Sequence, residues 1–443
     1  MNEVRRTWWV VGVAVALALL SAGAARADQV KLNVALANPL LKADKKQATY
    51  LMVGLTGFKI AGQKRAPVNV AIVLDKSGSM TGEKIRKAKE AAIMAVNRLR
   101  ADDIVSVVAY DDTIEVLVPA TKALDKEDII AKINRLEPGN TTALFAGVSR
   151  GAQEVRKFLD KNRVNRIVLL SDGLANVGPS SPRELADLGG SLGKEGIGVT
   201  TIGLGLDYNE DLMTQLAIKS EGNHFFAEKA GDLERGFDLE FGIGLAVVAQ
   251  EIMVRIVCAP GIRPVRMMNA TADITDRTVL VSLNQLYSER RADLLLEIEV
   301  PATASGKVRG VANVEVTYAN MATKTTDRLT SEIAVKFVDS EVEVTEKTEK
   351  VVMVVVVEQI ANEQSMRATE LRDKGKIEDA RKLLLANGSY LRENGRAYGA
   401  EKLLKQAEKN EEDAGNLDEG NWKHQRKDMR DRQQEASAPA CAF

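Results

Sequence analysis

The sequence predicts an α/β domain built on a doubly wound, Rossmann-like parallel sheet, flanked by an antiparallel β-sandwich and followed by a helical region. Three observations lead to this prediction. Residues 70–74 form an uninterrupted apolar run, typical of a strand that is buried on both faces. Strand-like and helix-like segments alternate over residues 67–240. Period-two runs then dominate residues 245–340, and residues 342–435 read as charged helices.

Length and charge set the outer limits of the interpretation. The chain has 443 residues, and we expect about three domains at roughly 150 residues each. Its apolar content of 45% is enough for a sizeable core, because this is the normal share in globular proteins. The net charge of -1 gives no reason to expect nucleic acid or an acidic membrane as a partner.

Residues 1–27 are predicted to be a signal peptide. Arg5 and Arg6 precede an apolar stretch at residues 8–20, and Ala25 and Ala27 form a small-x-small cleavage site. An uncleaved anchor is the alternative, but the apolar stretch is shorter than the ~20 residues that a spanning helix needs. We therefore expect an exported protein, periplasmic or secreted, without a membrane span after cleavage near Asp28.

The first segment of the mature chain reads as β-structure. Residues 28–66 contain two alternating runs, at 30–36 and 50–55, which predict antiparallel strands. A polar linker at residues 62–67 then leads to the first strand of the α/β domain.

The α/β domain, at residues 67–240, is expected to contain strands and helices in turn. Strands are expected at residues 70–74, 104–110, 114–118, 167–170, 198–205 and 223–226. Helices are expected at residues 83–99, 126–135, 144–159, 182–194, 209–220 and 232–239. Parallel strands joined through helices require right-handed crossovers, so helices should cover both faces of the sheet.

Three oxygen-bearing side chains follow the first of these strands. Asp75, Ser77 and Ser79 alternate on one loop, so that a single turn can direct a carboxylate and two hydroxyls to one point. The loop lies at the carboxyl end of a central strand, where open α/β sheets bind ligands. Hard divalent cations prefer oxygen ligands, but these three groups supply only part of a coordination shell.

Two later loops supply further oxygens. Residues 139–142 precede a helix and include Thr141 and Thr142, and Asp172 follows another apolar strand. Each of these residues by itself is more often a helix cap or a turn residue. Asp111 and Asp112 also follow a strand, and we interpret them as hairpin turn residues.

These motifs resemble the von Willebrand factor type A (VWA) domains, whose metal ion-dependent adhesion site has the pattern Asp-x-Ser-x-Ser, then Thr, then Asp. The resemblance spans roughly residues 67–239 and rests on Leu-Asp-Lys-Ser-Gly-Ser-Met and Leu-Ser-Asp-Gly. Thr142 matches the family threonine better than Thr141 because of its spacing to Gly147. The metal ligands that the resemblance implies are Asp75, Ser77, Ser79, Thr142 and Asp172.

The resemblance also implies the metal and the partner. Mg2+ is the expected ion, with Mn2+ or Ca2+ possible, and a carboxylate from a partner protein usually completes the shell. Two aspartates only just neutralise a divalent ion, and neutral hydroxyls leave it electrophilic, so the ion should attract an acidic group.

The rest of the chain is expected to form two more regions. Strands are predicted at residues 251–258, 278–283, 292–300, 308–318 and 332–337. With residues 28–66 they predict a sandwich into which the α/β domain is inserted, and a continuous independent sandwich is the alternative.

One long helix is expected at residues 346–371 despite its valines, and Gly375 and Gly395 should divide later helices. The polar segment from Asn410 should fray, and residues 436–443 should be disordered.

We therefore expect an exported adhesion or assembly module that binds a protein partner through a divalent metal, and not an enzyme. A metal-assisted hydrolase is one alternative, although no histidine is placed as a general base, since His224 reads as a structural residue at the edge of the last strand. A scaffold with its partner surface on the C-terminal helices is the other alternative.

Cys258 is expected to be a buried free thiol and Cys441 to lie in the tail, although an oxidising compartment would allow them to pair.

Overall fold

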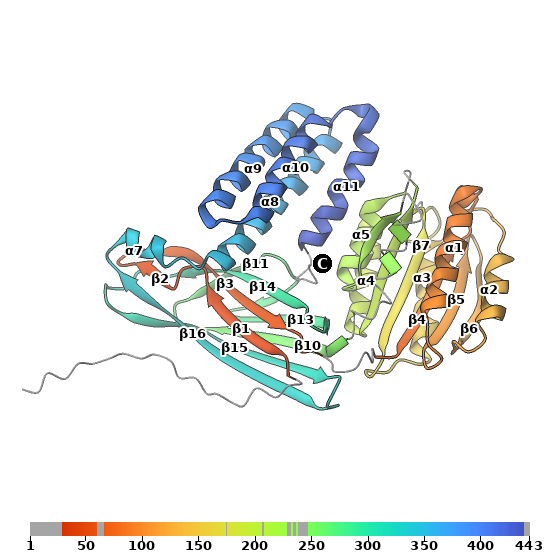
Figure 1. Ribbon diagram of the computed structural model, residues 1–443, viewed down its shortest axis with the longest axis horizontal. Coiled ribbons are helices and arrows are strands. Elements are labelled where there is room, and N and C mark those ends of the chain that lie inside the picture. The colour runs from red at the N-terminus through yellow and green to blue at the C-terminus, as the bar shows by residue number, and fades with distance from the viewer. Residues whose placement is uncertain are drawn as a thin grey trace, which may run out of the picture.

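The computed structural model describes residues 29–59, 66–173, 175–205, 208–227, 232–233, 236–237 and 247–437. It contains a parallel-sheet domain, a sandwich of two further sheets and a group of C-terminal helices (Figure 1). The predicted fold class is confirmed. The expected signal peptide, Cys441 and most of the helix expected at residues 232–239 lie outside the described residues.

The sheet of the α/β domain has six strands in the order β6-β5-β4-β7-β8-β9. Only β6 runs antiparallel to its neighbour, so the carboxyl ends of the other five strands meet at one edge. Every residue of the central strand β4 is buried, as its apolar run predicts. The strands are β4 Val68–Asp75, β5 Ile104–Tyr110, β6 Ile114–Lys122, β7 Val164–Ser171, β8 Ile197–Leu204 and β9 His224–Ala227.

Helices cover both faces of this sheet, because successive side chains of β4 point to opposite faces. Val70 and Ile72 pack on the side of helices α1 and α2, whereas Ala71 and Val73 pack on the side of α3. All predicted helices between residues 83 and 220 are present, with ends shifted by a few residues at most. They are α1 Glu83–Arg98, α2 Lys126–Asn134, α3 Leu144–Arg156, α4 Pro182–Lys194 and α5 Glu210–Lys219.

The second region consists of two sheets packed face to face around a shared apolar core. One has the order β1-β3-β14-β11 and the other the order β12-β13-β10-β15-β16-β2. Each sheet combines strands from before and after the α/β domain, so this domain is inserted into the sandwich. The strands are β1 Lys31–Leu36, β2 Leu40–Lys42, β3 Gln47–Thr56, β10 Val247–Cys258, β11 Arg263–Met267, β12 Asp273–Thr275, β13 Thr278–Tyr287, β14 Arg291–Val300, β15 Val308–Asn320 and β16 Thr326–Val338.

Three of these strands were not predicted. Strands β2, β11 and β12 have only three to five residues, which is too short for a period-two pattern to be recognised. β11 also contains Pro264, which argues against a strand in a sequence reading. Each is an edge strand in its sheet, where a missing backbone donor is tolerated.

The valine-rich stretch forms a helix, as predicted. Helix α8, Lys350–Asp373, follows the short helix α7, Glu341–Glu346. Val352 and Val356 are one helical turn apart, and both are buried against Met52 of β3 and Leu295 of β14. Burial on the outer face of the four-stranded sheet therefore outweighs the strand propensity of valine.

Two predicted helix boundaries are wrong. The long helix begins at Lys350 and not at residue 346, because the chain leaves the helical conformation at residues 347–349. Gly375 does follow the end of α8, with a positive φ of 75°, but Gly395 lies inside helix α9, Ile377–Tyr398. The helix ends instead at Gly399, which adopts the left-handed conformation. A Cβ on Gly395 would lie 2.8 Å from Leu404, so this glycine permits close packing between α9 and α10, Glu401–Gly415.

The expectation that the chain frays from Asn410 is also wrong. Helix α10 continues to Gly415, and helix α11, Glu419–Ser437, follows. Asp413 is buried and accepts hydrogen bonds from Arg432 at 2.9 Å and from Gln425. Polar composition misled the prediction, because these charges pair within the fold and are not all solvated.

Helix α11 packs against the α/β domain beside α5 and β9 (Figure 1). Glu210, at the start of α5, forms ion pairs with Arg426 and with Lys427, the latter at 2.9 Å. Lys427 also donates to the carbonyl of Tyr208 at 3.0 Å, and Arg426 contacts Asp211 at 2.6 Å. We refer to these five residues as the α5–α11 contact.

Candidate metal centre

The loops that carry the predicted ligands meet at the carboxyl edge of the parallel sheet. The amide of Gly78 donates to the carbonyl of Asn140 at 2.7 Å, and the amide of Gly139 donates to the carbonyl of Lys76 at 2.5 Å. A Cβ on Gly78 would lie 3.2 Å from the Asn140 carbonyl oxygen, so the two loops are in close contact. The segments after β4 and before α3 are thereby held against each other.

Asp75 links the first loop to the end of β7. Its carboxylate is fully buried and accepts hydrogen bonds from the Ser77 amide at 2.9 Å, the Ser171 hydroxyl at 2.6 Å and the Tyr110 hydroxyl at 3.2 Å. Burial raises the pKa of Asp75, the bonds from Ser171 and Ser77 oppose this rise, and the nearby Asp172 carboxylate adds to it. Asp75 is therefore held in place by neutral donors rather than by a cation.

Ser77 and Ser79 lie on the same side of their loop. Their hydroxyl oxygens are 3.1 Å apart, although Ser77 is buried and Ser79 is exposed. A short 3-10 turn, η1 Gly78–Met80, produces this arrangement before α1 begins. The alternating spacing therefore brings the two hydroxyls together.

The structure distinguishes the two candidate threonines. Thr142 is 2% exposed, whereas Thr141 is exposed to solvent. The amide of Thr142 donates to the Asn176 side chain at 2.7 Å, and its carbonyl accepts from the Asn176 amide at 3.1 Å. These bonds tie the threonine loop to the segment after Asp172. Within the described residues the Thr142 hydroxyl makes no hydrogen bond.

Asp172 combines full burial with incomplete pairing. One of its oxygens, Oδ2, contacts the Lys84 ammonium at 2.9 Å. The other, Oδ1, is buried and has no hydrogen-bond partner among the described residues. A buried carboxylate oxygen without a donor is costly, so this atom is a candidate ligand for a cation or an ordered water.

Sequence reasoning missed the role of Lys76 and part of the role of Asp111. Asp111 does form the hairpin turn by accepting from Thr113, as predicted, but it also binds Lys76 at 2.5 Å. Although burial acts to raise it, hydrogen bonds from Lys76 and Thr113 lower the pKa of Asp111 to about 2. The carbonyl of Asp111 accepts from the Ala143 amide at 2.8 Å, so this residue joins three loops. No short-range pattern could reveal the pairing, because the partners lie 35 positions apart.

The residues present fit a hard divalent cation. Among the described residues no group of three or more His, Cys, Asp or Glu side chains is placed to hold a metal. A metal at this edge would therefore depend on hydroxyl and carboxylate oxygens, which suit Mg2+, Mn2+ or Ca2+ better than softer ions. The unpartnered Asp172 oxygen and the unbonded Thr142 hydroxyl are consistent with such a ligand set.

The two other residues singled out in the sequence are structural. His224, in the edge strand β9, bonds the Thr201 hydroxyl at 2.8 Å and the Tyr208 hydroxyl at 3.0 Å. Burial lowers the pKa of His224 to about 4. Cys258 is a buried free thiol, as predicted, and burial raises its pKa to about 11.

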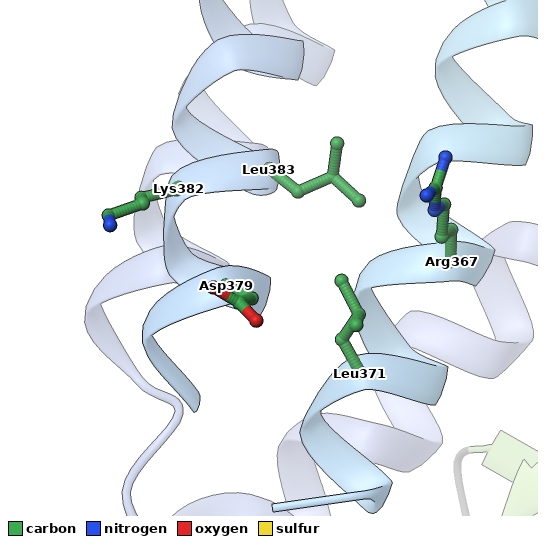
Figure 2. Close-up of a pocket in the computed structure, with 5 residues that line it drawn as sticks. All are labelled: Arg367, Leu371, Asp379, Lys382 and Leu383. Carbon is green, nitrogen blue, oxygen red and sulfur yellow. The ribbon is translucent and has the colours of Figure 1, made fainter. Parts of the chain in front are cut away.

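A groove of about 370 Å³ lies elsewhere, between α8 and α9 (Figure 2). Leu371 and Leu383 point toward each other across it, and Lys382 points away from it. Arg367 and Asp379 complete the lining. None of the predicted metal ligands contributes to this groove, so it is separate from the candidate metal centre.

Comparison with known proteins agrees with this description of the α/β domain. Residues 69–237 match the model of the von Willebrand factor type A domain. Two solved structures share the fold over most of the chain. The first is von Willebrand factor type A from Catenulispora acidiphila, with a TM-score of 0.69 and 16% identity, covering 84% of this chain and 88% of that one. The second is the ArnB paralog VWA2 from Sulfolobus acidocaldarius, with a TM-score of 0.62 and 18% identity, covering 92% of this chain and 98% of that one.

Curated relatives are similar over shorter stretches. They include Uncharacterized protein YfbK of Escherichia coli, 26% identical over 48% of this chain and 37% of its own length. Uncharacterized protein sll0103 of Synechocystis is 27% identical over 60% of this chain and 65% of its own length. Human inter-alpha-trypsin inhibitor heavy chain H3 is 25% identical over 42% of this chain and 23% of its own length. The chain thus spans less than two thirds of the length of these relatives. Among the described residues, no helix combines the length and hydrophobicity needed to cross a membrane.

Proposed function

We propose that this chain, which contains a von Willebrand factor type A domain at residues 69–237, is an exported adhesion or assembly module that binds an acidic group of a partner protein through a divalent metal. Mg2+ is the proposed ion, and Mn2+ or Ca2+ would suit the same oxygen ligands. The proposed ligands are Asp75, Ser77, Ser79, Thr142 and Asp172.

One observation carries the proposal. Asp172 is fully buried at the edge where three loops meet, and its Oδ1 lacks a partner among the described residues. A buried carboxylate oxygen without a donor destabilises the fold unless a ligand or water satisfies it. A cation bound there would remove this penalty, so the buried carboxylate would be stable in the metal-bound protein.

The composition of the ligand set favours binding of an acidic partner. Asp75 and Asp172 supply two negative charges, and the other three proposed ligands are neutral hydroxyls. A divalent ion held by this set would keep enough positive charge to attract a carboxylate from outside. The residues of this chain would hold and orient the ion, and the partner would supply the remaining ligand.

The described side chains favour partner binding over metal-assisted hydrolysis as the function of the candidate metal centre. Both ring nitrogens of His224 are engaged by Thr201 and Tyr208, and its lowered pKa makes it a weak base. Asp111 is committed to Lys76 and Thr113. Neither group is therefore available to activate a water molecule.

Calorimetry tests the metal. The purified chain should bind Mg2+, Mn2+ or Ca2+ at one site, and Asp172→Ala should raise the Kd about tenfold or more. Asp112→Asn is the matched control, since it removes an exposed carboxylate beside the same edge. The metal proposal fails if all three ions leave the wild-type chain unbound.

Two further experiments test the partner and the export. Crosslinking and capture from the exported fraction of the native organism should recover a partner in Mg2+ but not in chelator, and Asp172→Ala should recover none. N-terminal sequencing of the exported chain should begin near Asp28. Capture that is equally strong in chelator would contradict a metal-bridged contact.

A further inference from the structure

Lys84 places a positive charge on the carboxylate that the proposed metal would need. We propose that Lys84 is a built-in counter-ion of this site. Without metal, its ammonium neutralises Asp172. A divalent ion must share or displace this contact, so it binds more weakly than it would without the Lys84 charge. This inference rests on the proposed function and adds a residue that controls the affinity of the same site.

The contact is asymmetric. The Lys84 ammonium lies 2.9 Å from Oδ2 of Asp172 and leaves Oδ1 without a partner among the described residues. The side chain of Asp172 is fully buried, whereas that of Lys84 is 24% exposed. The carboxylate is thus fixed inside the protein, and the ammonium can move toward water when a stronger cation arrives.

The fold provides space for this lysine. Lys84 is in the first turn of α1, and its aliphatic stem runs past Gly205, at the end of β8. A Cβ on Gly205 would lie 3.0 Å from Cε of Lys84. The absence of a side chain at Gly205 therefore lets the lysine stem reach Asp172 across the loop edge.

Charge at the edge explains why the lysine matters. Within the proposed ligand set, Asp75 and Asp172 contribute -2, and the bound Lys84 contributes +1, which leaves -1 for an incoming divalent ion. Lys76 does not change this sum, because Asp111 neutralises it at 2.5 Å. Removing Lys84 would therefore double the net negative charge that attracts the metal.

An opposite role for Lys84 is that it positions Asp172 for the metal. The geometry argues against this role, because full burial already restricts the Asp172 side chain. Orientation by one more hydrogen bond adds little to a side chain that packing holds, whereas repulsion between two cations sharing one carboxylate acts at short range. The two roles predict opposite changes in metal affinity, so a single substitution separates them.

The test is calorimetric titration of the full chain with Mg2+. Lys84→Met keeps the length of the aliphatic stem and removes the charge, and it should lower the Kd for Mg2+ about three- to tenfold. Lys89→Met is the matched control, since Lys89 lies on the same helix but donates to the carbonyl of Asn134. An unchanged or higher Kd in Lys84→Met would overturn the inference.

Thermal unfolding gives a second readout. In chelator, Lys84→Met should unfold at a lower temperature than wild type, because Asp172 then lacks any cation. Added Mg2+ should raise its Tm by more than it raises that of wild type or of Lys89→Met. Equal Tm values in chelator would count against the inference. If wild type binds Mg2+ and Lys84→Met binds it equally, the inference fails while the proposed function stands; if no variant binds Mg2+, both fail.

Discussion

Two carboxylates of the α/β domain are buried in opposite electrostatic situations. Asp172, at the candidate metal centre, has one lysine on Oδ2 and no partner for Oδ1 among the described residues. Glu210, in the α5–α11 contact, has both oxygens engaged, by Arg426 and by Lys427. The Asp172 carboxylate thus has a cation on one oxygen only, whereas the Glu210 carboxylate has a cation on each oxygen.

This difference separates a binding site from a structural contact. At Glu210, burial acts to raise the pKa, but the charges of Arg426 and Lys427 lower it, so the pair is stable as it stands. At Asp172 the fold leaves an oxygen that only an additional ligand or water can satisfy. Incomplete pairing of Asp172, together with its place among the loops that carry the predicted ligands, therefore favours this edge as the candidate binding site.

Breaking the fully paired contact should have the largest effect on stability. Lys427 is 3% exposed at its side chain, so Lys427→Met should lower the free energy of unfolding by about 3 kcal/mol, near the low end for a broken buried pair because Arg426 remains. Urea unfolding measures this loss. Lys423→Met, at an exposed position on the same helix, is the control, and a loss of equal size there would contradict the comparison.

Acidification should lower the stability of the chain through His224, which bonds the Tyr208 hydroxyl next to the same contact. Its pKa is about 4 in the folded chain against an ordinary 6.5, so the unfolded chain binds more protons between these values. Stability is then fully present above pH 6.5 and is lost as the pH falls toward 4, by about 2 kcal/mol at pH 5. Unfolding of wild type and His224→Gln at pH 7 and pH 5 measures this, and the variant should depend less on pH. Equal pH dependence of the two chains would argue that His224 does not titrate in this way.

Mg2+ should stabilise the under-paired edge and not the fully paired contact. At a concentration ten times its Kd, Mg2+ should add about 1.4 kcal/mol to the free energy of unfolding of wild type. Asp172→Asn should abolish this gain, because it removes the unsatisfied carboxylate. Glu210→Gln should keep it, despite a lower starting stability, and loss of the gain in Glu210→Gln would mean that the two regions are coupled.

The smallest effect concerns Glu221, where the α/β domain meets β13. Its carboxylate accepts from the Asn284 amide, and burial raises its pKa to about 7 against an ordinary 4.5. The folded chain binds more protons between these values, so this group lowers stability as the pH rises from 4.5 to 7. Glu221→Gln should raise the free energy of unfolding at pH 8 by about 1 kcal/mol, with little change at pH 5. The rise from 4.5 to about 7 costs roughly 3 kcal/mol at pH 8, and loss of the charged acceptor for the Asn284 amide offsets about 2 kcal/mol of this gain. A variant less stable than wild type at pH 8 would be evidence against this reading.

Much of the fold could be predicted because its signals are local. The apolar run of β4 and the Ser181, Pro182 and Glu184 capping box of α4 each place an element to within a few residues. The loop residues Asp75, Ser77 and Ser79 could be selected by spacing alone. Lys84 and Ser171 could not, since their contacts with Asp172 and Asp75 join positions 88 and 96 residues apart.

By itself, the sequence determined most of the longer strands and helices and the oxygen-bearing loops, because periodicity and turn chemistry act over a few neighbouring residues. Only the tertiary structure decided that Val352 and Val356 pack against Met52 and Leu295, that the chain after Asn410 stays helical, and that Lys84 meets Asp172. Those outcomes depend on burial and on charge pairs between distant segments, whose free energy exceeds local preference and appears only when the segments are brought together.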